Sequence, residues 1–571
     1  MTSIQNFNTS EQKILLMTLP FLTPLIPPLG ISCIKSFLQK YSYKVKTVDM
    51  MSDIEIREIC YKYFDTLQGF IPEKKQGHFF NIGLDVLYNQ FMAHINYTNK
   101  QKYMELVKIL IYQNFFVEIT DEIAQTLINI VDHFFSKLEN YLISLFDQEQ
   151  PTVFGLSVYK GTLASSYFAA RLIRKKFPQI KIVMGGTIFS QDLYPGTPNF
   201  NNFLEKASFI DKIFVGESEV LFLKYLRGEL PTDQRVYSLK DINEQLLNLN
   251  TVPLPDYSDF NLSFYPLLPA FTSRGCIYRC SFCAETVYWK RYNCKNAQKV
   301  VDEFEELIQK YDRRLFVLTD CLINPLAKDI SEEILKRNLY VYWDVYIKID
   351  KQVCDPNQAL LWRKGGFYRA RLGIESGSQN VLNLIDKKIT VQQIKDGLRS
   401  LAFAGIKTTT YWIAGHPGET EEDFQQTLDL LEELQDCIFE AECDPFRYFH
   451  TGQVNAEEWL KLKGNRLLYP DDAADMLITQ SYSLNSYPTR EIIYERGCRF
   501  KEHCKKLGIP NPYSLRELLE ADRRWQKIQP NAVPSIMELN KNPGKYLEEN
   551  KNIVRIFTAR NTHSKSVDFD F

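Results

Sequence analysis

Ser273-Arg274-Gly275-Cys276-Ile277-Tyr278-Arg279-Cys280-Ser281-Phe282-Cys283-Ala284-Glu285 is the stretch that decides how this chain is interpreted. Its three cysteines have three and then two residues between them, and they follow an apolar run, 264–272, that predicts a strand. Thiolates at this spacing can wrap a compact metal centre. Three such ligands occupy three corners of an iron–sulfur cube and leave one iron open. The alternative is a zinc site completed by Cys294 or by a remote histidine.

The spacing C-x-x-x-C-x-x-C, with an aromatic residue before the last cysteine, resembles the signature of the radical S-adenosylmethionine (radical SAM) superfamily. The resemblance implies that Cys276, Cys280 and Cys283 hold a 4Fe-4S cluster, whose open iron binds S-adenosylmethionine (SAM). An electron from the cluster would then break a carbon–sulfur bond of SAM and give a 5′-deoxyadenosyl radical. A low-potential electron donor of the flavodoxin or ferredoxin type is the partner that this chemistry implies.

Composition limits the other possibilities. The 571 residues suffice for two or three domains, and the 45% hydrophobic content is that of a globular protein. The 68 Lys and Arg nearly balance the 70 Asp and Glu, so there is no basic footprint of the kind that nucleic-acid binding requires. Twelve cysteines in a chain of this length are not a disulfide scaffold and indicate a reducing cytoplasm.

One uncharged segment, 14–34, is long enough to span a bilayer. It contains Pro20, Pro24, Pro27 and Pro28, which would break a helix in its middle. We therefore expect a buried strand followed by a proline-rich loop, and no membrane span.

The first half of the chain alternates short apolar runs with helical patterns. This alternation predicts an α/β unit over 1–230 with a doubly wound, Rossmann-like parallel sheet. A region rich in apolar residues at helical spacing, about 51–150, predicts a helical insertion. A polar connector with two prolines, 231–262, predicts a linker. The expected strands are 13–19, 44–48, 152–158, 180–184 and 212–215.

This first unit resembles the cobalamin-binding domain that precedes many radical SAM barrels. Ligands of such sheets lie beyond the carboxyl ends of the strands. The resemblance implies that cobalamin would lie against Ser157, Gly185, Gly186, Gly216 and Glu217. The Asp-x-His-x-x-Gly motif that places a histidine on cobalt is missing, so we expect no such ligand. The alternative is that the fold persists without the cofactor.

The second half, 263–444, repeats the strand–helix alternation with a longer period and predicts a partial (β/α)6 barrel whose site lies at the C-terminal strand ends. The resemblance implies that these ends bind SAM. For Gly373 to Ser378, the alternative is a glycine turn with a helix cap at Ser376 or Ser378. The implied SAM contacts are Phe282, Asp320, Glu375, Ser378, Ile413 and Gly415, with Ile413 and Gly415 near the adenine.

Residues 445–571 predict a mainly helical cap over the barrel, followed by a tail. Helical patterns cover 471–482 and 515–527. Cys498 and Cys504 could be ligands of an auxiliary cluster, but such a cluster would need more ligands at regular spacing, so ordinary buried thiols are favoured.

The resemblance implies a radical SAM enzyme, most simply a cobalamin-dependent methyltransferase acting on an unactivated carbon of a natural-product, peptide or lipid substrate. A peptide or carrier-bound substrate is included in this expectation, whereas nucleic acid is not. Two alternatives stay open: a non-methylating radical rearrangement or cyclisation, and a zinc-stabilised binding protein. No residue is assigned to the reacting atoms.

Overall fold

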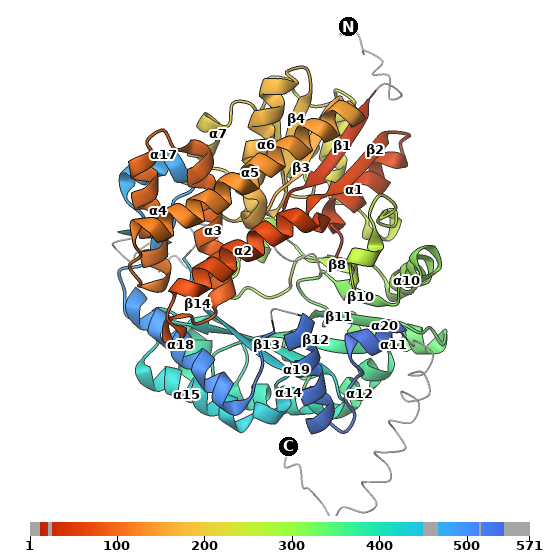
Figure 1. The fold of residues 1–571 in the computed structure, drawn as a ribbon. Coiled ribbons are helices and arrows are strands. Elements are labelled where there is room, and N and C mark those ends of the chain that lie inside the picture. Colours follow the sequence, from red (N-terminus) through yellow and green to blue (C-terminus); the bar gives the residue numbers. More distant parts are fainter. Residues whose placement is uncertain (1–11, 21–25, 290, 449–465, 513–514, 542–571) are drawn as a thin grey trace, which may run out of the picture.

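The computed structural model describes residues 12–20, 26–289, 291–448, 466–512 and 515–541. It contains two six-stranded parallel sheets, one formed by each half of the chain (Figure 1). This agrees with the predicted α/β fold. The tail expected at the end of the chain lies outside the described residues. Within the described ranges, none of the helices combines the length and the apolar character needed to span a membrane.

The first sheet has the strand order β2-β1-β3-β4-β5-β6, and every neighbouring pair is parallel. The chain passes from β1 to β2 on one side and then crosses to β3 on the other, which creates a switch point beside β1. The strands are β1 (Lys13–Thr18), β2 (Lys44–Asp49), β3 (Val153–Ser157), β4 (Lys181–Gly185), β5 (Lys212–Val215) and β6 (Val236–Ser238).

Strand β6 lies within 231–262, where the sequence predicts only a connector. It pairs with β5 in register Phe214↔Tyr237, so the sheet extends beyond residue 230. Three residues at a sheet edge are too short to display a periodicity, which explains why this strand was not predicted. The helices of this half that lie outside the insertion are α1 (Leu29–Gln39), α6 (Leu163–Lys176), α7 (Pro198–Lys206) and α8 (Glu219–Leu226).

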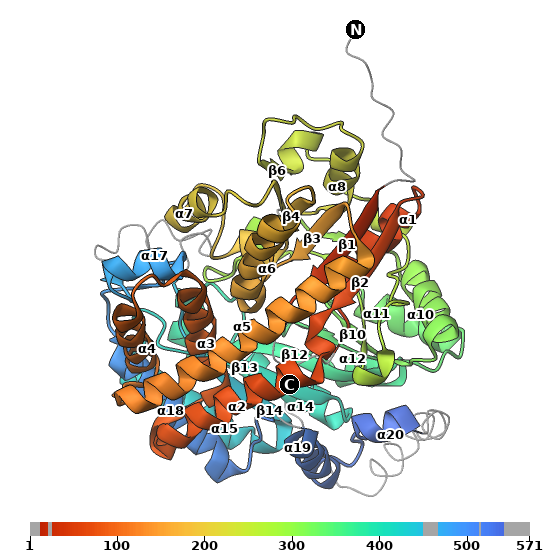
Figure 2. The ribbon, with the colours of Figure 1, turned by 45° about the horizontal axis from the view of Figure 1, so that its top comes forward.

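The helical insertion predicted between the second and third strands is present. Helices α2 and α5 lie side by side along the first sheet (Figures 1 and 2). The apolar stripe of α5, including Leu127, Val131 and Phe134, is buried in one core with Leu15 and Met17 of β1. The insertion consists of α2 (Ile54–Phe70), α3 (Phe79–Asn96), α4 (Lys100–Phe115) and α5 (Asp121–Glu149).

The second sheet has the order β14-β13-β12-β11-β10-β7, again parallel throughout. Its two edges are β14 and β7, so it is the open, partial barrel that was predicted. The strands are β7 (Leu268–Ala270), β10 (Leu315–Leu318), β11 (Tyr342–Tyr346), β12 (Phe367–Glu375), β13 (Lys407–Ala414) and β14 (Glu440–Pro445). The helices between them are α10 (Ala297–Tyr311), α11 (Ala327–Lys336), α12 (Pro356–Lys364), α13 (Gln379–Leu384), α14 (Val391–Phe403) and α15 (Glu421–Glu433).

The C-terminal region packs helices against this barrel. Helix α18 (Arg490–Leu507) contacts β13 and β14, while α19 (Leu515–Ile528) and α20 (Ile536–Lys541) lie near the start of β13. The helix predicted over 471–482 is shorter than expected. A 3-10 turn, Asp471–Ala473, leads into α17 (Ala474–Leu477), and the helix ends there because Ile478 takes a positive φ of 63° that a helix cannot continue through.

Candidate functional site

The cysteine loop begins where the second sheet starts. After β7 the short strand β8 (Ser273–Arg274) pairs with β9 (Asn293–Cys294), and the loop between them carries Cys276, Cys280 and Cys283. The buried Asp320 carboxylate at the end of β10 accepts hydrogen bonds from Thr272 and Ser273, including 2.9 Å from the Thr272 N–H. Asp320 therefore fixes the backbone from which the loop leaves the sheet.

The three thiols share this loop and are partly buried. Burial raises the pKa of Cys276, and it raises the pKa of Cys283 to about 12. Across the described part of the chain, no three His, Cys, Asp or Glu side chains are grouped closely enough to hold a metal ion. The structure thus brings the thiols onto one loop but does not arrange them as a finished ligand set.

Two buried lysines flank the loop. Lys348 Nζ lies 3.6 Å from the centroid of the Tyr278 ring and has no hydrogen-bond partner among the described residues. Lys387 Nζ lies 5.7 Å from the centroid of the Phe282 ring. Burial lowers the pKa of Lys348, which indicates a cation short of compensating charge. Positive charge beside cysteines favours their thiolate form, so the donor set and its surroundings fit an anionic metal cluster.

Glu375 and Ser378, the implied SAM contacts at and just after the end of β12, have different partners in this structure. Glu375 ends β12 with a positive φ of 67° and pairs with Lys387 at 2.6 Å. The Ser378 hydroxyl donates to Asp423 Oδ1 at 2.5 Å and caps α13 by accepting from the Val381 N–H. The helix cap considered as an alternative for Ser378 is therefore present, and the contact of either residue with SAM stays a prediction.

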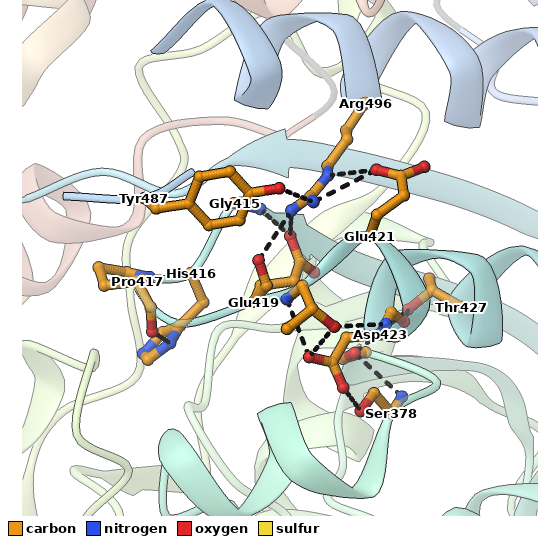
Figure 3. A network of polar contacts seen from close by, with 12 residues as sticks. Ser378, Gly415, His416, Pro417, Glu419, Glu421, Asp423, Thr427, Tyr487 and Arg496 are labelled. Carbon is orange, nitrogen blue, oxygen red and sulfur yellow. Dashed lines mark hydrogen bonds and ion pairs between the residues drawn. The ribbon is translucent and has the colours of Figure 1, made fainter. Parts of the chain in front are cut away.

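The end of β13 is held by a buried network (Figure 3). The Gly415 N–H donates to Glu419 Oε2 at 2.7 Å, and the same oxygen accepts from Arg496 Nη1 at 2.8 Å. Gly415 has a φ of 86°, and a Cβ there would lie 2.2 Å from Ile493 Cγ1. Glycine is required at this position because α18 approaches the strand end so closely.

Arg496 and Glu419 were not among the predicted site residues. Glu419 follows a glycine in the strand-end motif Gly415-His416-Pro417-Gly418-Glu419, which was a usable signal. Arg496 lies far along the chain in a region without a motif, so nothing in the sequence indicated that it supports this strand end. Ile413, two residues before Gly415, lies in β13 and is partly buried.

A first cavity lies between the two halves of the chain. It encloses about 1680 Å³, solvent at its mouth included. The second half of the chain, which carries the cysteine loop, lines it with Ser273, Arg274 and Thr319. All five residues predicted to contact cobalamin line it from the first sheet, namely Ser157, Gly185, Gly186, Gly216 and Glu217.

The paired glycines are present for two different reasons. A Cβ on Gly186 would lie 2.2 Å from the Val158 carbonyl oxygen, and its φ is 121°, so the backbone itself requires glycine. A Cβ on Gly185 would meet nothing closer than 3.5 Å, so there glycine only keeps cavity space open. A side chain at position 185 would take up space in this part of the cavity, so a glycine here is compatible with a large ligand in the first cavity.

Glu217 is committed to the other half of the chain. Arg274, two residues before Cys276, forms ion pairs with Glu217 and with Glu219, the latter at 2.5 Å. Glu217 also accepts a hydrogen bond of 3.0 Å from the Leu247 N–H. The carboxylate predicted to face cobalamin therefore joins the first sheet to the cysteine loop.

A second cavity lies beside the first, with Tyr159 lining the first and Lys160 the second. It encloses about 1580 Å³, solvent at its mouth included. The barrel contributes the strand ends at Gly415 and Pro445, the insertion contributes Asp85 of α3, and the C-terminal region contributes Arg490. With Lys160 from the first half of the chain, four separate parts of the chain meet around this space.

Residues 271–431 match the family described as the radical SAM superfamily. The anaerobic magnesium-protoporphyrin IX monomethyl ester cyclase of Rubrivivax gelatinosus is 26% identical over 307 residues, which cover 49% of this chain and 54% of that protein. The chain spans about half the length of the curated relatives it matches first.

Two solved structures share the fold over nearly the whole chain. The radical SAM methyltransferase TsrM from Kitasatospora setae has a TM-score of 0.58 at 15% identity, covering 97% of this chain and 100% of that one. The cobalamin-dependent SAM radical enzyme OxsB has a TM-score of 0.57 at 16% identity, covering 98% and 82%. Residues 271–431 therefore match the radical SAM family that the cysteine motif predicted, and the fold of nearly the whole chain is that of these two enzymes.

Proposed function

We propose that this protein is a cobalamin-dependent radical SAM methyltransferase acting on an unactivated carbon. The observation that carries the proposal is the first cavity, whose two walls are the strand ends of the first sheet and the start of the cysteine loop. A ligand bound to the first sheet in this cavity would lie close to the start of the cysteine loop, where the radical would be formed.

The residues that would hold each group follow from their positions. Cys276, Cys280 and Cys283 would bind the 4Fe-4S cluster beside Lys348 and Lys387. SAM would lie along the strand ends, against Phe282, Asp320, Glu375, Ser378, Ile413 and Gly415. Cobalamin would occupy the first cavity against the five residues that line it from the first sheet.

When bound, the cluster and SAM supply a carbon-centred radical, and cobalamin supplies a methyl group. The chain's own contribution is position. The ion pairs of Arg274 with Glu217 and Glu219 hold the cysteine loop against the first sheet. Arg496, through Glu419, fixes the β13 end where the adenine of SAM is expected. Small shifts at such sites cost large factors in rate, so these supports matter for turnover.

A low-potential donor of the flavodoxin or ferredoxin type would deliver the electron. We also propose that the cobalamin-type domain extends to Ser238 and not only to residue 230, because β6 completes its sheet. A second function, radical cyclisation without methyl transfer, is favoured by the cyclase named among the relatives.

The test is anaerobic reconstitution with iron, sulfide and cobalamin, followed by incubation with SAM, a low-potential reductant and candidate substrates. We expect iron–sulfur and corrinoid absorbance, 5′-deoxyadenosine, S-adenosylhomocysteine and a product heavier by one methylene. Gly185→Val should lower corrinoid loading and leave iron content unchanged, because Gly185 lines the first cavity and a Cβ there would lie against two other lining residues, Phe214 and Ser218. Full iron loading and SAM cleavage without any bound corrinoid would overturn the proposal, and a product of unchanged carbon count would favour cyclisation.

A further inference from the structure

The second cavity has an uneven distribution of charge. Its described lining contains three cationic side chains, Lys160, Arg447 and Arg490, and two anionic ones, Asp85 and Asp192. These groups divide into a neutralised corner and a single cation elsewhere.

The neutralised corner is built around Asp85. Its carboxylate pairs with Arg447 at 2.7 Å and with Lys160 at 2.9 Å, while the charge of Asp192 also acts on Arg447. The cations hold the pKa of this buried carboxyl below its usual value. This corner therefore offers no uncompensated charge to a ligand.

Arg490, the first residue of α18, is different. Its guanidinium donates to the side-chain oxygen of Gln113 at 2.6 Å and to the backbone carbonyl of Gln113, both of them neutral acceptors. The guanidinium carbon lies 5.6 Å from the centroid of the Phe116 ring. In the part of the chain that the structure describes, no carboxylate forms an ion pair with it. Burial lowers the pKa of Arg490, although the charge of the neighbouring Glu491 acts to raise it.

The side chain of Gln480 is a second, independent observation that points to a polar ligand in this cavity. Both polar atoms of its side chain are buried, and neither has a hydrogen-bond partner among the described residues. Gln480 lines the same cavity. A buried amide without partners is costly, and a ligand group that can both donate and accept would remove that cost.

The remaining lining is strongly aromatic, with Phe116, Phe446, Tyr469 and Tyr494 among its residues. We infer that the second cavity binds a bulky, partly aromatic molecule that carries an oxyanion, a carboxylate or a phosphate, and that Arg490 binds this oxyanion. The guanidinium fork matches both groups in two-point geometry. Reading the cavity as the substrate site rests on the proposed function; the binding itself does not.

The cavity also joins this anchor to the predicted reaction site, because Gly415 and Pro417 at the end of β13 line it too. Ile493, one turn after Arg490 on α18, faces Gly415. Arg490 would thus hold the substrate by a group away from the reacting carbon, a positioning role that leaves the reacting end free to face SAM.

The test uses three naphthalene probes of the same size in isothermal titration calorimetry with the full, cluster-reconstituted chain. We expect 2-naphthoate or 2-naphthyl phosphate to bind at least tenfold more tightly than the neutral 2-naphthamide, since a charge-assisted pair contributes that much. The stronger of the two anions identifies carboxylate or phosphate as the native group. Equal binding of the amide, or no binding of any probe, would overturn the inference without requiring any variant.

Substitutions then assign the residue. Arg490→Gln should weaken the preferred anion about tenfold and leave 2-naphthamide unchanged, whereas Arg490→Lys should keep most of the preference. Lys505→Gln, which removes an exposed charge from the same helix, is the matched control and should change neither affinity. If Arg490→Gln weakened amide and anion alike, Arg490 would serve only to shape the cavity. Corrinoid loading and SAM cleavage are separate readouts, so failure here is distinguishable from failure of the proposed function.

Discussion

Arg496 of α18 and Glu419 at the end of β13 form an ion pair of 2.8 Å in which both side chains are almost completely removed from solvent, with exposed fractions of 0% and 1%. The same Glu419 oxygen accepts from the Gly415 N–H. A helix of the C-terminal region thereby holds the strand end at which the adenine of SAM is expected.

Arg496→Gln should destabilise the fold by about 3–5 kcal/mol, because it leaves Glu419 buried without its cation. It should also weaken SAM binding, because Gly415 loses its fixed acceptor. Chemical denaturation and calorimetric titration of SAM measure the two effects. Arg499→Gln is the control, since Arg499 pairs with the exposed Glu421 and should cost about 1 kcal/mol or less. An unchanged SAM affinity in a destabilised Arg496→Gln protein would limit this residue to stability.

Arg274→Gln should loosen the first cavity, because it leaves Glu217 and Glu219 as buried carboxylates without their shared cation. We expect lower corrinoid loading and faster limited proteolysis. Arg279→Gln removes the same charge from an exposed position of the same loop and should have little effect. Adding Glu217→Gln and Glu219→Gln to Arg274→Gln should recover part of the lost stability. A triple variant no more stable than the single one would contradict the ion-pair explanation.

Replacing any one of Cys276, Cys280 and Cys283 by alanine should abolish the cluster and all SAM cleavage. Cys498→Ala should leave both intact, because Cys498 lies on α18 beside Gly77 of the insertion, away from the cysteine loop. Iron and sulfide analysis after anaerobic reconstitution, with electron paramagnetic resonance, measures the outcome. Loss of iron in Cys498→Ala would make the C-terminal thiols ligands.

Glu442 on β14 should make stability depend on pH. Burial, and then the charge of Asp444, raises its pKa from 4.5 to about 7. The folded protein therefore holds this proton more tightly than the unfolded chain, so the stabilisation is full below about pH 4.5 and is lost as pH rises to about 7. A folded-state pKa that lies one pH unit above the unfolded value corresponds to about 1.4 kcal/mol of stability.

Chemical denaturation should show that the Glu442→Gln variant lacks this pH-dependent loss of stability. Its free energy of unfolding should rise relative to that of the wild type between pH 4.5 and 7. Glu433→Gln is the opposite case, because the hydrogen bond from Lys395 lowers the pKa of Glu433. That variant should lose stability relative to the wild type as pH rises above the acid range. Parallel curves for wild type and Glu442→Gln would show that Glu442 titrates normally.

The sequence predicted both parallel sheets because apolar runs of strand length alternate with helical patterns. This alternation can be recognised from neighbouring residues alone. It did not predict β6, since three edge residues carry no periodicity, nor the early end of α17 at Ile478, since a positive φ in a β-branched residue has no sequence signal. The predicted glycine pair lies at a cavity wall, but Gly186 is dictated by the Val158 backbone and not by a ligand.

The candidate site was predictable where a motif places ligands close together along the chain. Its supports were not, because they come from distant segments: Arg496 reaches Glu419, and Arg490 reaches the cavity from a region without a motif. The charge partners of Arg274 were equally hidden, since Glu217 and Glu219 lie more than fifty residues before it, in the loop after β5 and at the start of α8.

The link from Arg274 to Glu217 and Glu219 has a consequence for building hybrid proteins. The arginine belongs to the cysteine loop of the second half, and both carboxylates belong to the first half. Each half therefore supplies one side of the same ion-pair network. A chimera that joins this N-terminal half to a foreign barrel inherits two buried carboxylates without a cation, and a foreign N-terminal half leaves a buried guanidinium without its anions. These three residues must therefore be exchanged as a set.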